Sequence, residues 1–174
     1  VHGEGVIARI FSSDATDLAA LADNYATYAA PNPDVAPLVA WPEPVGGYRL
    51  RHYRLAEHVN EGSQMRIFRT RKLMVNPLLP RAVPRDVHKL SPHSHSDFEQ
   101  GSLALAGTYM HHLRYPWGPD MTLWQPDQAE EMGSPSLLVV PPKVVHTSRN
   151  LDAPGVLVDI FAPPRWDFSR KGIV

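Results

Sequence analysis

The sequence has no cysteine among its 174 residues. Disulfide bonds, thiolate metal sites and a cysteine nucleophile are therefore excluded. A chain without cysteine fits a reducing compartment, and we expect a cytoplasmic protein. Long apolar runs are also missing. The sequence contains no stretch of about 18 apolar residues, the length that predicts a membrane-spanning helix. The N-terminal stretch VHGEGVIARIF does not have the basic and apolar regions of a signal peptide.

An excess of charge of either sign is missing as well. The formal net charge is −1 and the pI is near 6.8. Neither a nucleic acid nor an anionic membrane is expected as the main partner, because both attract strongly basic surfaces. With 43% hydrophobic and 20% charged residues, the composition is that of a soluble globular protein. The length suits one domain with a sizeable core.

Proline, by contrast, is abundant, and the 18 prolines disfavour long helices. One helix is nevertheless predicted, with Ser13 or Asp14 as its cap and its end near Ala30, because apolar residues recur there at helical spacing. The stretch 31–47 is rich in proline and glycine, and predicts an extended arm with little regular structure. The N-terminal quarter is therefore expected to lie over a barrel or a partner subunit.

From residue 48 onward the apolar period changes to two, which is typical of half-buried strands. The runs that show this period are YRLRHYRL (48–55), MRIFRTRKLMV (65–75), LALAGTYMHHL (103–113), SLLVVP (136–141) and GVLVDIFA (155–162). Turn residues separate the later runs at intervals of roughly ten, the pattern of an all-β sandwich or barrel. We expect a single domain, with a helix and arm over 1–47 and a barrel over 48–174.

Two histidines stand out within this barrel. In the stretch SPHSHSDFEQG, His93 and His95 are two residues apart. Side chains at this spacing on a strand point to the same face, close enough to share a metal ion at about 2.1 Å each. A pair of this kind is weak evidence when it stands alone. A second signal lies downstream in VVPPKVVHTSRN, where His146 follows a β-branched run and Asn150 ends the stretch.

Together the two stretches resemble the motifs of the cupin superfamily, conventionally written G-x5-H-x-H-x3,4-E-x6-G and G-x5-P-x-G-x2-H-x3-N. The residues that match the first motif are His93, His95 and Gly107. The residues that match the second motif are Pro141, His146 and Asn150, with Gly133 near its opening position. The resemblance implies an all-β jelly-roll barrel of the RmlC type, a double-stranded β-helix. It also implies one divalent transition metal ion, Fe, Mn, Ni or Zn, bound by the three histidines and a fourth ligand.

The fourth ligand is Glu99 or Gln100. Three residues separate His95 from Glu99, and six separate Gln100 from Gly107, so the two halves of the motif select different residues. Adjacent side chains on a strand face opposite ways, and both cannot point inward. The charge of a divalent ion favours Glu99, whereas the strand register favours Gln100. A further departure is Lys143, which occupies a glycine position of the second motif, so a different turn is expected there.

Several neighbouring side chains are candidates for catalysis and substrate binding. His111 and His112 are adjacent, so only one faces inward; His111 and Tyr109 share a face and are the candidate catalytic residues. The candidates for substrate binding are Arg114, Trp117 and Trp124. Arg114 would meet a substrate carboxylate, and the tryptophans would line the mouth of a pocket. Core packing and surface exposure are the competing interpretations of all five candidates.

The resemblance implies a metal-dependent enzyme acting on a small metabolite that carries a carbonyl or hydroxy-carboxylate group. Redox-neutral isomerase, lyase or decarboxylase chemistry is the expectation. Two alternatives stay open: a dioxygenase that uses O2, and a non-catalytic barrel that binds a metabolite or a metal. Three imidazoles and one oxygen leave coordination positions open on an octahedral ion, as catalytic sites require. Cupin barrels often associate through their sheets, and a homodimer is expected here.

Overall fold

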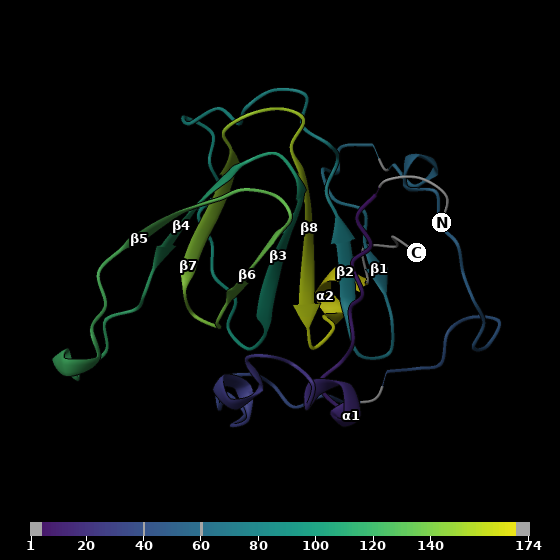
Figure 1. Ribbon diagram of the computed structural model, residues 1–174, viewed down its shortest axis with the longest axis horizontal. Helices are drawn as coiled ribbons and strands as arrows, with labels where there is room; N and C mark the ends of the chain where they lie inside the picture. The colour runs from purple at the N-terminus through teal and green to yellow at the C-terminus, as the bar shows by residue number, and fades with distance from the viewer. Residues whose placement is uncertain (1–4, 40, 60, 170–174) are drawn as a thin grey trace.

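The structure is a computed structural model and describes residues 5–39, 41–59 and 61–169. Within these ranges eight strands form two antiparallel sheets (Figure 1). The larger sheet has the order β1-β2-β8-β3-β6 and the smaller one the order β5-β4-β7. The strands are β1 (Phe68–Arg69), β2 (Met74–Pro77), β3 (Glu99–Ala106), β4 (Tyr109–Arg114), β5 (Gln128–Met132), β6 (Ser136–Val140), β7 (Val145–Asn150) and β8 (Val156–Ala162). The expected all-β class is confirmed.

Side chains from the two sheets meet in the interior. Tyr109 of β4 packs with Ala104 of β3 and Leu157 of β8. A second cluster contains Ile67, Met74, Phe98 and Phe161. Among the described residues, nine buried side chains are polar or charged beside thirteen hydrophobic ones. Because buried polar groups require hydrogen-bond partners, an interior this polar indicates that part of it is a site rather than a packed core.

Three of the predicted strand runs are confirmed. The run at 103–113 lies in β3 and β4, the run at 136–141 corresponds to β6, and the run at 155–162 corresponds to β8. The run at 65–75 is not one strand, because a turn at 70–73 divides it into β1 and β2. The expected strand at 48–55 is wrong, since this segment is irregular and ends in the 3-10 helix η2 (Leu55–Glu57). Sequence analysis also did not predict β5, a polar edge strand whose central residues are exposed.

The irregular path before residue 55 has a local cause. The Arg51 guanidinium donates to the carbonyl oxygens of Val45 and Gly47, at 2.6 and 2.7 Å, and so holds the chain in a turn. Leu50, expected on a half-buried face, is 98% exposed. Alternation of apolar residues produces a strand only where a neighbouring strand accepts its hydrogen bonds. The arm is as expected, with no helix or strand within 31–39 and 41–47.

The predicted N-terminal helix is wrong in its length and in its cap. The structure has a four-residue helix α1 (Thr16–Ala19) and a separate 3-10 turn η1 (Tyr25–Tyr28), and no side chain caps α1. Leu21 is 78% exposed and Tyr25 is 49% exposed, so the apolar face that suggested a long helix packs against little. Short helices without tertiary packing are not stable in water, which explains the break.

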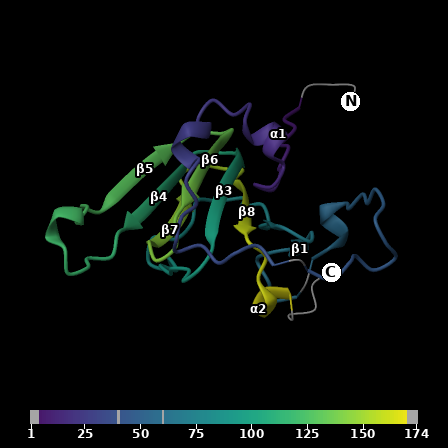
Figure 2. The ribbon, with the colours of Figure 1, turned by 90° about the horizontal axis from the view of Figure 1, so that it is seen from below.

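Two further segments complete the described chain. The loop between β4 and β5 contains η3 (Met121–Leu123) and projects away from the barrel in both views (Figures 1 and 2). The C-terminal helix α2 (Trp166–Ser169) follows β8. Arg165 ties this end to the barrel, because its guanidinium pairs with Asp97 and lies 4.9 Å from the centre of the Phe98 ring.

Among the described residues, no helix is both long enough and apolar enough to cross a membrane.

Candidate metal centre

The backbone itself brings the distant histidines together. His93 and His146 form an isolated antiparallel bridge, in which the His93 amide donates to the His146 carbonyl at 3.1 Å and the His146 amide donates back at 2.8 Å. The ring centres are 4.5 Å apart for His93 and His146, 5.0 Å for His93 and His95, and 5.2 Å for His95 and His146. One nitrogen of each ring lies within 4.8 Å of the other two. The three imidazoles can therefore hold one metal ion.

The hydrogen bonds of two rings leave the correct nitrogen free for an ion. His93 Nδ1 lies 2.8 Å from the Ser91 carbonyl oxygen, and His146 Nδ1 lies 3.0 Å from the Val144 carbonyl oxygen. A carbonyl oxygen only accepts, so each Nδ1 carries the proton and each Nε2 keeps a lone pair. His146 Nε2 is buried and has no hydrogen-bond partner in the described structure. Orphaned buried nitrogens of this kind fit a metal ligand whose partner is an ion.

Gln100 adds an oxygen to this group. It is 4% exposed on β3, and its Oε1 lies 2.8 Å from His95 Nε2. Without an ion, His95 Nε2 donates to this amide oxygen. A bound ion would replace the hydrogen bond, because two ligand atoms at right angles on an ion, each at about 2.1 Å, are also about 3 Å apart. Glu99, the adjacent residue, faces the other side of the strand and does not line the same cavity. Strand alternation therefore brings Gln100, not Glu99, to the histidines.

Burial keeps the imidazoles in the form that binds metal. It lowers the pKa of His95 from its ordinary value of 6.5 to about 4, an effect that the Gln100 hydrogen bond opposes. Burial likewise lowers the pKa of His146. Both rings are therefore neutral at physiological pH, and neutral imidazole is the ligand form. His93 is the exposed member of the group, so this side of the site faces solvent.

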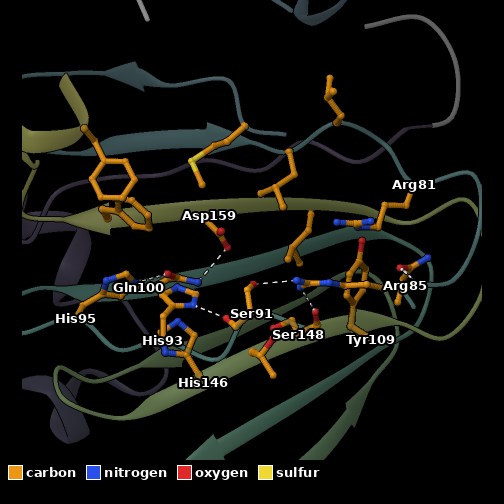
Figure 3. Close-up of a pocket in the computed structure, with 18 residues that line it drawn as sticks. Arg81, Arg85, Ser91, His93, His95, Gln100, Tyr109, His146, Ser148 and Asp159 are labelled. Carbon is orange, nitrogen blue, oxygen red and sulfur yellow. Dashed lines mark hydrogen bonds between the residues drawn. The ribbon is translucent and has the colours of Figure 1, made fainter. Parts of the chain in front are cut away.

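These residues line one end of a cavity of about 200 Å³ between the sheets (Figure 3). Asp159 is the only carboxyl group among its described lining residues. Its Oδ1 accepts hydrogen bonds from Gln100 Nε2 and Ser102 Oγ, both at 3.2 Å. The Gln100 amide is thereby oriented with its oxygen toward His95. Burial raises the pKa of Asp159 from 3.8 to about 7, although the Ser102 hydrogen bond opposes this effect.

Of the two candidate catalytic residues, the structure places Tyr109 in the cavity and His111 behind it. Tyr109 lies at the end remote from the histidines (Figure 3), and burial raises its pKa to about 12, so its hydroxyl stays protonated. His111 is 1% exposed and its Nδ1 lies 2.7 Å from Ser148 Oγ. It does not line the cavity. The geometry therefore fits a buried core histidine better than a residue that touches substrate.

The three candidates for substrate binding do not reach this cavity. Arg114 points to the opposite face of β4 from Tyr109, where its guanidinium pairs with Asp127 at 3.0 Å. Trp117 and Trp124 stack on each other in the projecting β4–β5 loop, with ring centres 4.5 Å apart. Trp117 is 66% exposed. The strand parity of Arg114 and the outward course of the loop explain why none of them lies near the histidines.

The turn before His146 differs from our expectation. Lys143 stands at a glycine position of the motif, yet it adopts φ +70°, the left-handed conformation that glycine favours. Its amide donates to the His95 carbonyl at 2.6 Å, and its ammonium group pairs with Asp34. The expectation of a different turn is therefore wrong. Lysine keeps the glycine geometry, at a cost of about 1 kcal/mol, and joins the two histidine segments.

Sequence reasoning missed the charged residues that line the cavity: Arg81, Arg85 and Asp159. Asp159 did leave a signal, because it is a charged residue at an inward position of an otherwise apolar run, between Leu157 and Phe161. Arg81 and Arg85 lie in an irregular, proline-containing segment whose sequence has no periodicity. Only the folded chain shows that this segment reaches the cavity.

Asn150, the last residue of the second motif, fixes that segment. Its Oδ1 accepts from the Arg85 amide at 3.1 Å, and its Nδ2 donates to the carbonyl oxygens of Val83 and Asp152 at 3.0 and 2.7 Å. The side chain is fully buried. Asn150→Ala is expected to lower the free energy of unfolding by about 3 kcal/mol, because three partly buried hydrogen bonds of about 1 kcal/mol each are lost. Thermal denaturation should show a midpoint lower by roughly 10 °C.

Asn32→Ala is the matched control for this substitution. Asn32 is half-buried, and its side chain accepts one exposed hydrogen bond, from the Asp34 amide. Its replacement should change the midpoint by no more than about 2 °C, since surface substitutions alter stability by about 0.5 kcal/mol or less. Equal midpoints for the two variants would show that Asn150 does not anchor the segment.

Two facing antiparallel sheets, with histidines from two strand segments converging between them, define a double-stranded β-helix of the cupin type. Several solved structures are similar to this chain. KdgF from Halomonas sp. is similar, with a TM-score of 0.51 and 19% identity, over 69% of this chain and 99% of that chain. An RmlC-like cupin from Shewanella frigidimarina has a TM-score of 0.47 and 18% identity, over 68% and 96% of the two chains.

A protein from Klebsiella pneumoniae with a double-stranded β-helix domain has a TM-score of 0.47 and 16% identity, over 65% of this chain and 84% of that chain. No protein-family model matches the sequence, and no curated protein matches it. At 19% identity the likeness to KdgF shows the fold and nothing finer. The chain has the cupin fold, and the expected double-stranded β-helix is confirmed.

Proposed function

We propose that this chain is a metal-dependent cupin enzyme acting on a small metabolite with a carbonyl or hydroxy-carboxylate group, without net oxidation or reduction. One observation carries the proposal. His93, His95 and His146 converge beside the oxygen of Gln100, in a cavity whose only described carboxyl is Asp159. A metal-ligand set and a proton-transfer group thus share one small space, which is the requirement for redox-neutral catalysis.

The donor set fits a divalent transition metal. Three imidazole nitrogens and an amide oxygen suit Fe, Mn, Ni or Zn, and His146 Nε2 is a buried atom that has no other partner in the described structure. We propose Gln100 as the fourth ligand, because Glu99 lies on the other face of β3. When bound, such an ion polarises a substrate carbonyl and stabilises negative charge on its oxygen.

The protein's own residues would then handle the proton. Asp159 Oδ1 accepts from Gln100 and Ser102, whereas Oδ2 has no hydrogen bond among the described residues. Asp159 Oδ2 removes a proton from the carbon next to the substrate carbonyl and returns it to a neighbouring atom. The proton is conserved in such a rearrangement, so no oxidant or reductant is consumed.

Proton exchange provides a direct test of this proposal. The purified protein, loaded in separate samples with Fe(II), Mn(II), Ni(II) or Zn(II), is incubated under nitrogen in D2O with a panel of small hydroxy- and oxo-acids. Proton NMR then follows deuterium at the carbon next to the carbonyl. We expect incorporation or turnover with at least one metal, lost after EDTA treatment and restored by readdition of the metal.

Two outcomes would contradict the proposal. Turnover that requires O2 and consumes it in proportion to product would indicate a dioxygenase. Binding of metal and acids with no exchange and no product, with or without O2, would indicate a barrel that binds a metabolite without converting it.

A further inference from the structure

Beyond the histidines the cavity carries two positive charges, with Arg81 beside Tyr109 and the Arg85 guanidinium between Tyr109 and the histidines (Figure 3). Arg81 and Arg85 both line it, in a part of the structure that the proposed chemistry does not use. The Arg85 guanidinium donates to the Ser148 carbonyl at 3.0 Å, to Ser91 Oγ at 2.8 Å and to the Lys89 carbonyl at 3.3 Å. All three acceptors are neutral. They fix the position of the guanidinium and leave its charge uncompensated.

Arg81 is held differently. Its backbone pairs with Gly155 in a bridge, at 2.8 and 2.9 Å, while its side chain points into the cavity near Tyr109 (Figure 3). Within the described part of the chain, its guanidinium has no hydrogen bond and no ion pair. The Gly155 backbone lies close to the Tyr109 side chain here, because a Cβ on Gly155 would lie 2.9 Å from the Tyr109 hydroxyl. The backbone thus presents a half-buried, unpaired cation to the cavity.

Among the described residues, no carboxyl group pairs with either arginine, and Asp152, whose charge acts on Tyr109, accepts from the Thr108 amide instead. Burial, and then the charge of Arg81, lowers the pKa of Arg85, which shows that the two cations repel each other. The nearby Tyr109 hydroxyl remains neutral because burial raises its pKa to about 12. Asp159 is bonded to Gln100 and Ser102 instead. Two unbalanced, partly desolvated cations cost folding free energy, and such costs concentrate at sites that bind ligands.

We propose that Arg81 and Arg85 bind a second anionic group of the substrate, a carboxylate or a phosphate. The substrate is then a small dianion, with a hydroxy- or oxo-acid facing the histidines and the second anion between the guanidinium groups. This inference rests on the proposed function for the identity of the first end. A cavity of about 200 Å³ limits the chain between the two ends to a few atoms, since sites for drug-sized ligands occupy about 300–1,000 Å³.

Matched acids measure the second anion directly. Lactate has the hydroxy-acid end alone, whereas malate and 2-hydroxyglutarate add a carboxylate on chains of different length and 3-phosphoglycerate adds a phosphate. Calorimetric titration of the metal-loaded protein should show at least one dianion binding about tenfold or more tightly than lactate. The acid that binds more tightly than lactate identifies the second anion as carboxylate or phosphate.

The tighter binding of the dianion relative to lactate should disappear in Arg81→Gln, while lactate affinity and metal content stay unchanged. Arg81→Lys keeps the charge without the planar fork, and should recover part of the advantage. Arg149→Gln is the control, because Arg149 lies on β7 outside the cavity and its loss removes the same charge from the same region. Circular dichroism and thermal melting check that every variant folds.

A second arm separates this inference from the proposed function. Inorganic phosphate is titrated into protein freed of metal by EDTA, and its affinity should fall about tenfold or more in Arg81→Gln. If phosphate affinity falls in this way but no metal-dependent turnover is found, the anion site is supported and the proposed function is contradicted. If no dianion exceeds lactate, or if its advantage survives Arg81→Gln, the second anion site is overturned even where metal-dependent turnover is found.

Discussion

His146→Ala is expected to remove nearly all transition metal from the purified protein. The parent protein should carry about one equivalent per chain, held by three imidazoles and the Gln100 oxygen. His146 is the buried member of the group, and its Nε2 has no other partner in the described structure. Loss of groups that merely support a ligand weakens metal affinity by about 10- to 100-fold. Loss of a ligand should weaken it by at least about 100-fold, measured by elemental analysis after gel filtration.

His88→Ala is the control for this experiment. His88 is an exposed histidine outside the cavity, so its loss should leave the metal content unchanged. Circular dichroism should show the same strand content in both variants, because the barrel is held by its sheets and core clusters. Full metal retention by His146→Ala would mean that the convergence of the three rings does not form the site.

His93 and His95 were predictable from a short-range pattern, and His146 from the resemblance to the second cupin motif. His93 and His95 share a face wherever the chain is extended, and the motif fixes how far downstream the third ring stands. The choice between Glu99 and Gln100 was a question of register, which charge and spacing answered differently. The structure places Gln100 inward because β3 pairs with both β6 and β8. That pairing involves residues about 40 and 60 positions away, which local patterns do not encode.

The cationic end was not predictable for a related reason. Arg81 reaches the cavity through a bridge to Gly155, and Arg85 is placed by the buried side chain of Asn150. Both contacts join the irregular segment that holds the arginines to residues far away in the sequence, Asn150 at the end of β7 and Gly155 just before β8. The arginines of 48–55 were more conspicuous in the sequence, yet Arg51 serves to shape the arm. Periodicity locates strands, whereas the ends of a barrel cavity are built by the connections between them.

Asp159 links the two halves of the site. It pairs across β8 and β3 with Ser102, and across β8 and β2 with Asn76. Asn76 is fully buried, and neither polar atom of its side chain has a partner in the described structure. A row of polar side chains thus crosses the inner face of the larger sheet, where a packed core would place apolar residues. These buried polar groups lower the stability of the fold, and they orient Gln100 and place a carboxyl group in the cavity.

Asp159→Asn is expected to reduce the metal-dependent exchange rate by about 10²- to 10⁴-fold, the usual contribution of a general acid or base. The asparagine oxygen still accepts from Gln100 and Ser102, so the metal content should not change. The same variant should be more stable than the parent when both are free of metal. Burial raises the carboxyl pKa from 3.8 to about 7, so the parent loses stability as pH rises through this window, and asparagine does not.

The sign and size of that stability difference make the test specific. Below about pH 4 the carboxyl is protonated in both the folded and unfolded states, and the titration contributes no difference. Above about pH 7 the ionised parent is less stable by up to about 4 kcal/mol, so urea denaturation at pH 5 and pH 8 should show a widening gap in favour of the variant. Asp127→Asn, which removes an exposed carboxyl paired with Arg114, should show neither effect. Unchanged exchange in Asp159→Asn with full metal content would place the proton-transfer group elsewhere, because the buried carboxyl would then have only a positioning role toward Gln100.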